Sequence, residues 1–267
     1  MPDVLILGCG FTGRRVAERL LARGCRVRCT TRDSLNLEHP GALSGLRGMV
    51  TPGVRVLHSI PTLAGEMDRV AVEALEGAAR VVYLSTTAVY GNAVCVDETT
   101  PAAPESDRAR ARVRTEQAVL DGPWAPLVLR PAAIYGPGRG IHVSMRIRDG
   151  GGVVSRIHVD DVATHAEAAL LSEVTGAWPV ADDHPCPSSE VAEFLANWGT
   201  GVEIPHPPVD CIPWHPGAPT ARHSNRRVDG SAIRRVLGIS LRYPSYLTGI
   251  PAALDEQRRA CHDRDSQ

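Results

Sequence analysis

A glycine-rich turn near the start of the chain constrains the fold more than any other feature. The apolar run 4–7 leads directly into the motif Gly8-Cys9-Gly10-Phe11-Thr12-Gly13, and an amphipathic helix is expected over 14–23. In such a motif the first glycine permits a tight turn, the second lets a pyrophosphate approach the backbone, and the third lets helix and strand pack closely. A second apolar strand, 26–31, follows at the spacing of a βαβ unit. The pattern predicts a dinucleotide site, and a purely structural turn is the alternative.

The end of the second strand distinguishes between the two nicotinamide dinucleotides. A site for NAD places Asp or Glu about 20 residues past the glycines, where the carboxylate binds the ribose 2′-hydroxyl. This chain has Thr31 and Arg32 there, and a guanidinium pairs with a 2′-phosphate through two hydrogen bonds. We therefore favour NADP(H) over NAD(H). Asp33 supports the alternatives, in which it binds the ribose of NAD or caps a helix.

Strands and helices alternate along the rest of the N-terminal two thirds. Apolar strands are expected at 54–59, 80–85 and 126–130, and helices at 63–76, 106–120 and 160–171. This alternation predicts an α/β fold, a Rossmann-type doubly wound parallel sheet with helices on both faces. The segment 34–53 is rich in Gly, Pro and Ser and holds only a weak strand, 46–50. The third strand of the usual order is therefore short or missing.

The length of 267 residues suits one large domain with a small lobe. We expect an NAD(P)-binding Rossmann domain over 1–175 and a smaller, mixed C-terminal substrate lobe over 176–267. Parts of 136–155, which include a flexible glycine stretch at 150–152, contribute to the cleft. Proline is frequent in the final third, notably over 205–219, which suits long ordered loops over a cofactor cleft.

The composition excludes several functions. All 29 residues of the Lys+Arg class are arginines, which excludes a P-loop, a Schiff-base enzyme and any catalytic lysine. A net charge of −1, with both signs interspersed, indicates neither a nucleic-acid-binding nor a membrane-surface protein. The first strand begins within three residues of the N-terminus, so no signal peptide is expected, and no apolar stretch reaches transmembrane length. Seven cysteines without a C-x-x-C pattern indicate free thiols and a cytoplasmic protein.

One group of residues has the chemistry of metal ligands without their spacing. Asp182, Asp183, His184 and Cys186 are close in the sequence, but the pattern matches no metal motif, and the prolines between and after them favour a turn. We therefore expect no metal site.

Further motifs follow the glycine turn in a recognisable order. They are Ser85-Thr86-Thr87-Ala88-Val89-Tyr90-Gly91, the segment 130–139 that starts Arg130-Pro131, the segment 157–163, and Leu237-Gly238 followed by 243–246. Together they resemble the extended short-chain dehydrogenase/reductase superfamily, the NAD-dependent epimerase/dehydratase group, over nearly the whole chain. With this resemblance, the expected cofactor contacts are Gly8, Gly10, Phe11, Thr12, Gly13, Thr31, Arg32, Ser59, Ile60, Pro61, Ser85 and Pro131.

The resemblance also implies a catalytic centre, and here the chain departs from the family. Its relatives use Ser/Thr with a Tyr-x-x-x-Lys pair on one helix. Counted from Gly91, Thr86 takes the Ser/Thr position; counted from Glu116, the tyrosine and lysine positions fall on Arg108 and Arg112. Arginine stays charged and cannot exchange a proton near neutral pH. The chain thus resembles the atypical members of the superfamily, which keep the cofactor fold without the Tyr/Lys pair.

Each candidate catalytic residue has an alternative interpretation. Arg112 would bind ribose or stabilise an oxyanion, and Arg108 would bind a substrate carboxylate or phosphate, unless both are merely solvated charges on a helix. His142 is the best remaining acid or base because its unperturbed pKa is suitable, although a loop histidine is more often merely exposed. Tyr90 and Tyr135 are expected to be packing residues. Asp160 is expected to cap the helix that follows it.

These inferences lead to two classes of function. We expect an NADP(H)-dependent reductase or dehydrogenase in which Thr86 and Arg112 polarise a substrate oxygen, while water, a substrate group or His142 relays the proton. The alternatives are a catalytically silent NADP(H)-binding sensor or scaffold, and a non-redox isomerase- or epimerase-type enzyme that uses the same cleft.

The retained Thr86 and substrate loop favour the enzyme. Thr87 and Ala88 stand where sugar-nucleotide dehydratases of the family carry Asp-Glu, which argues against that reaction. The expected partner is a small molecule, and a carboxylate or phosphate would suit Arg108 and Arg139. The resemblance also allows a homodimer, because relatives often pair through a four-helix bundle that includes the helix ending at Leu120.

Overall fold

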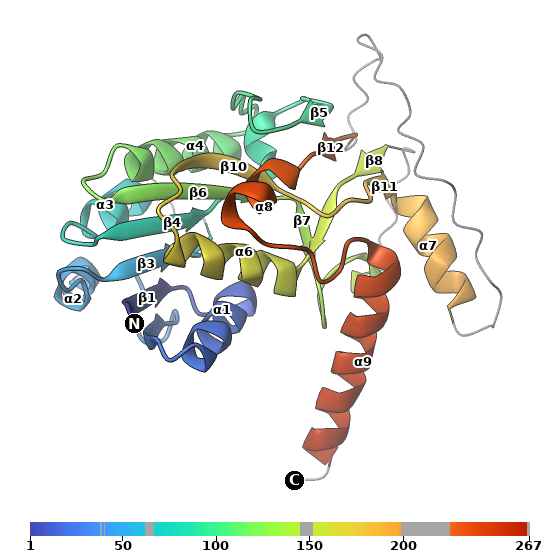
Figure 1. The fold of residues 1–267 in the computed structure, drawn as a ribbon, viewed down its shortest axis with the longest axis horizontal. Helices are drawn as coiled ribbons and strands as arrows, with labels where there is room; N and C mark the ends of the chain where they lie inside the picture. The colour runs from blue at the N-terminus through green and yellow to red at the C-terminus, as the bar shows by residue number, and fades with distance from the viewer. Residues whose placement is uncertain (38, 40, 62–66, 145–151, 199–224, 266–267) are drawn as a thin grey trace.

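The centre of the molecule is a six-stranded parallel sheet (Figure 1). A computed structural model describes residues 1–37, 39, 41–61, 67–144, 152–198 and 225–265. The strands lie in the order β10-β6-β4-β3-β1-β2. Their bounds are β1 (Asp3–Leu7), β2 (Arg26–Thr30), β3 (Arg55–His58), β4 (Arg80–Leu84), β6 (Ala125–Pro131) and β10 (Gly176–Val180). The expected Rossmann-type α/β fold is confirmed.

The strand order reverses beside β1. Leu7 of β1 lies opposite Thr30 of β2 on one side and His58 of β3 on the other. The chain therefore runs outward from β1 to β2 and then crosses back to β3. In open parallel sheets such a reversal leaves a crevice at the carboxyl ends of the strands, where ligands bind.

The expectation of a weak third strand over 46–50 is wrong. Most of the segment belongs to helix α2 (Ala42–Met49), and the Leu46 side chain of this helix is fully buried. A short apolar run does not distinguish a strand from a buried turn of helix. The third strand of the usual order is absent from the described residues, so β2 is an edge strand of the sheet.

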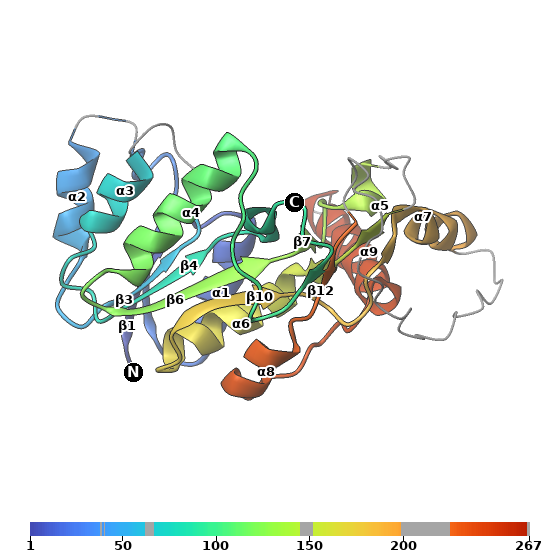
Figure 2. The same ribbon diagram turned by 90° about the horizontal axis from the view of Figure 1, so that it is seen from above.

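Helices cover both faces of the sheet (Figure 2). One face packs against α1 (Phe11–Ala22) and α6 (Val159–Leu171), and the other against α2, α3 (Met67–Glu73) and α4 (Asp107–Leu120). Val16 and Leu20 show why α1 packs this way: they lie four residues apart, hence on one side of the helix, and both are fully buried.

Most of the remaining elements gather beyond the carboxyl ends of the main strands, whereas α8 (Ser231–Leu237) packs against α6 and β10 (Figure 2). Three two-stranded pairs are formed by β5 (Cys95–Val96) with β12 (Arg227–Val228), β7 (Ala133–Tyr135) with β9 (Arg156–His158), and β8 (Val153–Val154) with β11 (Cys186–Pro187). The helical elements are η1 (Thr87–Tyr90), α5 (Ile141–Ser144), α7 (Ser188–Asn197), α8 (Ser231–Leu237) and α9 (Tyr246–Asp265).

Most predicted elements are found within a few residues of their expected bounds. Ser106 begins the 106–120 helix as its N-cap, accepting a hydrogen bond from the Ala109 N–H at 3.2 Å. The helix expected over 63–76 is described from Met67 to Glu73; residues 62–66, the first two glycines of 150–152 and the proline-rich stretch 205–219 lie outside the described residues.

Two further expectations concern the C-terminal half of the chain. The expected cap at Asp160 is wrong: His158 is the N-cap of α6, and its Nδ1 accepts from the Asp160 N–H at 3.2 Å. The proposed boundary near 175 stays a prediction, and β10, which follows it, lies against β6 in the main sheet.

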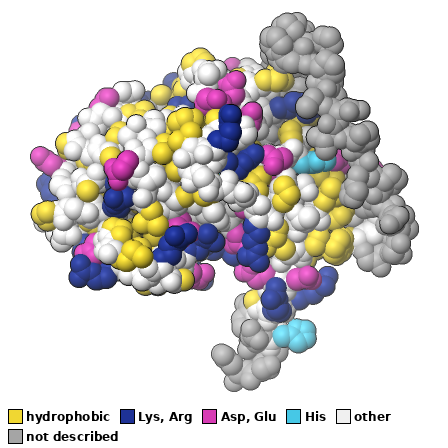
Figure 3. Space-filling view, viewed as in Figure 1, with side chains coloured by type: hydrophobic (Ala, Val, Ile, Leu, Met, Phe, Trp, Pro, Cys, Tyr) yellow, Lys and Arg dark blue, Asp and Glu magenta, His cyan; other side chains and the backbone are white. Residues whose placement is uncertain are grey.

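The surface and the thiols fit the composition. On the face in Figure 3, basic, acidic and apolar side chains are interspersed over the described elements. None of the described helices combines the length and the apolarity that a bilayer span needs. Cys9, Cys25, Cys29, Cys95 and Cys186 are free thiols.

Candidate functional site

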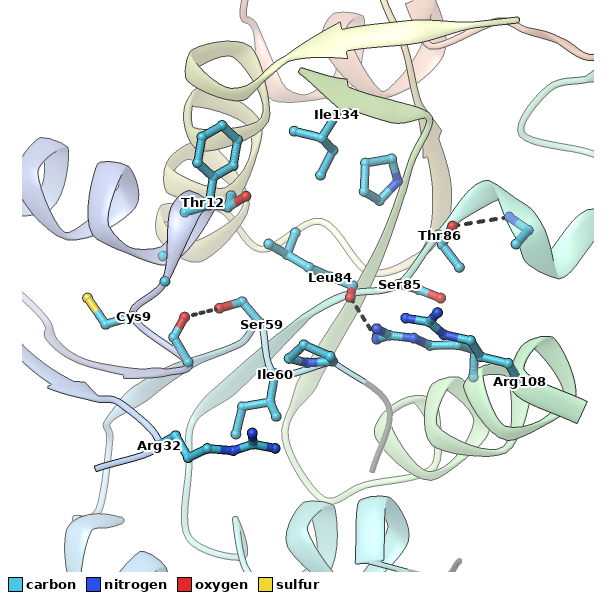
Figure 4. A pocket seen from close by; sticks show the side chains of 18 of the residues that line it. Cys9, Thr12, Arg32, Ser59, Ile60, Leu84, Ser85, Thr86, Arg108 and Ile134 are labelled. Carbon is cyan, nitrogen blue, oxygen red and sulfur yellow. Dashed lines mark hydrogen bonds between the residues drawn. The ribbon is translucent and has the colours of Figure 1, made fainter. Parts of the chain in front are cut away.

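A cavity of about 910 Å³ opens at the carboxyl ends of the central strands (Figure 4). This volume lies near the upper end of the roughly 300–1,000 Å³ typical of ligand pockets. All of the predicted cofactor contacts line it: Gly8, Gly10, Phe11, Thr12, Gly13, Thr31, Arg32, Ser59, Ile60, Pro61, Ser85 and Pro131. Thr86, Arg108 and Arg112 line it too, whereas His142 does not.

The glycine turn, residues 8–13, forms one wall of this cavity and requires its glycines for different reasons. Gly8 has a φ of +87°, a conformation that L side chains rarely adopt. A Cβ on Gly13 would lie 2.5 Å from the carbonyl oxygen of Gly8, so helix and turn could not pack as they do. A Cβ on Gly10 would meet no atom within 4 Å. Gly10 thus leaves open space where a ligand can approach the backbone.

The N-terminus of α1 points into that open space. The helix begins at Phe11, after Gly10, with no side-chain cap and no acidic residue in its first turn. The first N–H groups of a helix have no partner within the helix, and they carry its positive dipole end. Together with the gap beside Gly10, they fit the pyrophosphate of a dinucleotide.

Backbone contacts hold the glycine turn to the neighbouring strands. The Cys9 N–H donates to the Thr30 carbonyl at 2.7 Å. The Ser59 hydroxyl donates to the carbonyl oxygens of Leu7 and Gly8 at 3.0 and 2.7 Å, and Figure 4 shows the second bond. The turn after β3 is therefore hydrogen-bonded to the glycine turn, and these bonds hold two parts of the cavity lining in place.

Arg32 lies at the far end of the cavity, just past β2. The turn that carries it is closed by the Thr31 N–H donating to Ser34 Oγ at 2.9 Å and the Leu35 N–H donating to the Thr31 carbonyl at 2.9 Å. Arg32 lines the cavity and Asp33 does not, and Figure 4 shows the guanidinium of Arg32 beside Ile60.

Three residues that follow Arg32 in the sequence also line the cavity, and the sequence did not predict them. They are Leu35, Asn36 and Leu37, of which both leucines are buried. Two apolar residues spaced two apart, directly after a polar turn, are the only signal that would have found them. They give the Arg32 end of the cavity an apolar wall, which suits a flat aromatic base.

Thr86 starts the short helix η1 at the opposite end. Its hydroxyl oxygen accepts a hydrogen bond from the Ala88 N–H at 3.2 Å (Figure 4), which leaves the O–H proton available to a ligand. Arg226 holds this turn from outside: its guanidinium donates to the carbonyl oxygens of Thr87, Gly91 and Ala93.

Arg112 is fixed against the sheet. It is 9 % exposed, and its Nη1 donates to the Tyr83 hydroxyl at 2.5 Å and to the Leu84 carbonyl at 3.2 Å. Figure 4 shows the second of these bonds. Arg108 lies one helical turn earlier on α4 and is exposed. We call the cavity-lining residues Arg108, Ala109 and Arg112 the α4 wall.

Buried titratable groups lie beneath the α4 wall. The His58 ring packs edge-on against Tyr83, with 4.9 Å between the ring centroids. Burial, helped by the nearby charge of Arg112, lowers the pKa of His58 to about 3. Burial raises the pKa of Tyr83 to about 12, although Arg112 opposes this. Both groups are therefore neutral at pH 7, and the charged groups that act on them are Arg112 and the buried Asp68.

His142 occupies a different place from the one expected of a proton donor in the cleft. It lies on α5, half-buried, 6.5 Å from the Tyr135 ring centroid to centroid. Burial lowers its pKa. Tyr90 and Tyr135 are buried packing residues, as expected, and neither lines the cavity.

One group of metal-ligand types does come together, in the C-terminal third. Ligand atoms of His184, Cys186 and Glu190 lie within 4.8 Å of one another; Asp182 and Asp183 do not join them. Glu190 Oε1 is already hydrogen-bonded by His184 at 3.0 Å and by Tyr246 at 2.9 Å. Arg156 donates to the Cys186 sulfur at 3.3 Å. A guanidinium beside the thiol opposes a cation, so we assign no metal here.

Solved structures share this architecture over nearly the whole chain. A functionally unknown conserved protein from Silicibacter pomeroyi is 32 % identical, with a TM-score of 0.70, over 96 % of this chain and 99 % of that protein. A UDP-glucose 4-epimerase from Thermus thermophilus, solved with NAD, is 20 % identical with a TM-score of 0.72 over 96 % of this chain and 99 % of that one. The second likeness is one of fold.

A more local match exists among curated proteins, and no family model matches the chain. A 3-diazoavenalumate denitrifying reductase from a Streptomyces species is 36 % identical over 110 residues, which is 37 % of this chain and 35 % of that protein. The match thus spans about a third of the length of the reductase.

Fold, cavity and relatives define an α/β protein with a dinucleotide-type crevice. Over nearly its whole length the chain is similar to the Silicibacter protein, and it shares the fold of structures such as a putative NAD-dependent epimerase/dehydratase from Methylobacillus flagellatus (23 % identical, TM-score 0.74). Helix α4 of this chain contains no tyrosine, and the whole sequence contains no lysine.

Proposed function

We propose that the protein is an NADP(H)-dependent oxidoreductase of atypical type that acts on a small molecule. The observation that carries the proposal is the position of Arg32. It lines the far end of a dinucleotide-sized cavity, and its acidic neighbour Asp33 does not. An arginine at this place matches the charge of a 2′-phosphate, which distinguishes NADP from NAD.

The residues that would hold the cofactor are distributed along the cavity. The N–H groups at the start of α1 and the gap at Gly10 suit the pyrophosphate. Leu35 and Leu37 suit the adenine, and Pro131 suits the nicotinamide half. When bound, NADPH supplies a hydride to the substrate, or NADP accepts one from it.

The chain's own contribution is to orient and polarise the substrate. The Thr86 hydroxyl donates to the reacting oxygen while it accepts from the Ala88 N–H. The Arg112 guanidinium, held by Tyr83 and Leu84, stabilises negative charge that develops on that oxygen. In reduction the carbon gains the hydride and the oxygen gains a proton. Because arginine cannot supply that proton, it comes from water or from the substrate.

The relatives support this class of reaction. The Streptomyces protein is named as a reductase, and the Thermus protein was solved with NAD. A dehydratase is disfavoured because Thr87 and Ala88 offer neither an acid nor a base at the positions after Thr86.

The test is calorimetric titration of the protein with NADPH, NADP, NADH and NAD, beside the variant Arg32→Ala. We expect NADPH to bind most tightly, and its affinity to fall about 10–100-fold in the variant, since a hydrogen-bonded charge pair contributes roughly 1.5–3 kcal/mol. Arg26→Ala is the matched control, because Arg26 is the first residue of β2, the strand that leads to Arg32, and it is paired with Asp3 outside the cavity. If none of the four binds, the oxidoreductase proposal fails.

A second candidate is a protein that binds NADP(H) without turnover, as a sensor or scaffold. The observation that favours it is α4 itself, which offers arginine where relatives use tyrosine and lysine. Anaerobic mixing of the NADPH complex with carbonyl substrates separates the two: loss of absorbance at 340 nm, abolished in Thr86→Ala, supports the enzyme. A non-redox isomerase would instead convert its substrate with the dinucleotide unchanged.

A further inference from the structure

Helix α4 carries arginines at 108, 110, 112 and 114, and they fall into two groups. Arg110 pairs with Asp107 at 2.7 Å and donates to the Glu105 carbonyl at 2.7 Å, and like Arg114 it is exposed and outside the cavity. Arg108 and Arg112 are four residues apart, so they share one side of the helix, and both line the cavity. Within the described ranges, no carboxylate forms an ion pair with either.

The deeper of the two guanidiniums is held in one orientation. Tyr83 and Leu84 accept from Nη1 of Arg112, and its guanidinium carbon lies 5.5 Å from the centre of the Tyr83 ring. This leaves other N–H groups of the fork for a ligand in the cavity that the residue lines. A preorganised donor of this kind binds an anion with little loss of conformational entropy.

The surroundings of the pair strengthen its attraction for an anion. The described residues that line the cavity include no Asp and no Glu. None of the other residues that line the cavity near the pair carries a charge: they are Leu84, Ser85, Thr86, Ser106, Ala109, Pro131 and Ala132. Charge interactions are stronger in a site that is partly shielded from water than in water itself. Both arginines therefore attract an anionic ligand.

Elsewhere the fold does supply acids to its arginines. Arg130 of β6 donates to Glu116 of α4 at 2.7 Å, and both side chains are buried. Among the described residues, Arg130 and Arg110 thus have carboxylate partners, whereas the cavity-lining Arg108 and Arg112 form no ion pair.

Arg139 also lines the cavity, but it lies against the glycine turn and not against α4. Its guanidinium carbon lies 5.2 Å from the centre of the Phe11 ring, and Phe11 is the first residue of α1. That position suits the pyrophosphate rather than the reacting group. The structure thus separates Arg139 from Arg108, which the sequence offered as joint partners of an anionic substrate.

We propose that Arg108 and Arg112 form a carboxylate subsite beside Thr86, and that the substrate carries a carboxylate next to its reacting carbon. The inference rests on the proposed function, because it places the substrate next to the nicotinamide half of the cofactor. A carboxylate is planar and can span the two guanidiniums, with two hydrogen bonds to each fork or one to each. Its anchoring brings the adjacent oxygen to the Thr86 hydroxyl.

The experiment uses two probes that differ in charge and hardly in shape, phenylglyoxylate and its primary amide. Each is titrated into the protein saturated with NADP, and again into the protein alone. We expect the wild type to bind the carboxylate at least about tenfold more tightly than the amide, which corresponds to about 1.4 kcal/mol. Higher salt should narrow this difference.

Two variants make the test specific. Arg108→Gln removes one charge from the exposed part of the α4 wall and is expected to abolish the preference for the carboxylate. Arg114→Gln removes the same charge from the same helix outside the cavity, and the preference should remain. Thermal unfolding of both variants checks that they are folded.

Several results would overturn the subsite. They are equal affinity for acid and amide in the wild type, no measurable binding of the acid, and a preference that survives Arg108→Gln. Failure of NADP to bind would instead refute the proposed cofactor, and the titrations without NADP would still decide whether the arginine pair selects a carboxylate. The two failures are therefore distinguishable.

Discussion

The glycine turn and the α4 wall line the same cavity, and they differ in the chemistry that they offer to a ligand. The turn keeps each feature that a dinucleotide requires: the positive φ at Gly8, the gap at Gly10 and the close approach of Gly13 to the Gly8 carbonyl. The α4 wall instead presents two arginines to the cavity, Arg108 and Arg112, and no group that can exchange a proton near neutral pH.

This difference follows from what cofactor binding and proton transfer each require of a protein. Cofactor binding depends on backbone geometry, which few substitutions at the turn would tolerate. Proton transfer depends on the pKa of one side chain, which a single substitution replaces. An arginine at such a position cannot exchange a proton near neutral pH, but its permanent positive charge suits the recognition of anions.

The largest predicted effect separates the arginines that hold the fold from those that face the cavity. Glu116→Gln leaves Arg130 buried with a weakened partner, and we expect the free energy of unfolding to fall by about 3–5 kcal/mol. Arg108→Gln should leave it nearly unchanged. Denaturant unfolding measures both, with Asp107→Asn of the exposed Arg110 pair as control. Equal stability of Glu116→Gln and wild type would contradict the distinction.

The second prediction concerns a substitution in the glycine turn that weakens cofactor binding and leaves the fold intact. Gly10→Ala puts a methyl group into space that the protein leaves open, so we expect unchanged thermal stability and about 100-fold weaker NADPH binding, or roughly 2.8 kcal/mol. Gly13→Ala should lose both binding and stability. Gly48→Ala is the control, because its Cβ also meets nothing within 4 Å but lies on α2, outside the cavity. Normal NADPH binding by Gly10→Ala would refute the assigned pyrophosphate position.

The third prediction concerns pH and the region beneath the α4 wall. His58 has a folded pKa of about 3, whereas an unfolded histidine titrates near about 6.5. Between these values the unfolded chain binds a proton that the folded protein does not, so the stability from this group is present above pH 6.5 and is lost as pH falls. By pH 5 the loss is about 2 kcal/mol.

Denaturant unfolding at pH 7 and pH 5 tests this for the wild type and His58→Asn. The asparagine oxygen can accept the Ile60 N–H that donates to His58 Nδ1 at 3.4 Å. The variant should lose less stability between the two pH values than the wild type does. The same loss in both proteins would assign the pH dependence to other groups, such as His165, whose pKa burial lowers to about 4.

The smallest predicted effect tests how firmly Arg112 is held. Tyr83→Phe removes the hydroxyl that accepts from Arg112, and we expect a loss of about 1–2 kcal/mol in stability. Affinity for phenylglyoxylate should fall several-fold, with NADPH binding unchanged. Tyr90→Phe is the matched control, since the Tyr90 hydroxyl accepts from Arg130 at 3.2 Å away from the cavity. A parallel fall in both variants would mean that Tyr83 acts only on stability.

The cofactor half of the site was predictable from the sequence because its requirements are local. The glycines, the following helix and the residues just past β2 lie within one βαβ unit, where spacing alone determines which side chains meet. Segment 46–50 was mispredicted because five residues are too few to show a helical period. The contact between Arg112 and Tyr83 joins residues 29 apart in different elements, and no local pattern encodes it.

The α4 half was predictable only by position. Arg108 and Arg112, which were selected by their spacing from Glu116, line the cavity, yet the sequence did not show which arginines lack an acidic partner. It also offered His142 as a proton donor, whereas α5 places that ring beside Tyr135. Tertiary packing decides which way each of these side chains points, and the sequence alone does not show this.

Arg226 has a consequence for the order in which the molecule is assembled. Its bonds to the carbonyls of Thr87 and Gly91 join residues 139 and 135 positions apart, whereas the glycine turn is complete once β3 has formed. Contacts between distant parts of a chain form late, because a long loop must close first. On the ribosome, the nascent protein should therefore acquire its dinucleotide crevice well before the turn that carries Thr86 is locked.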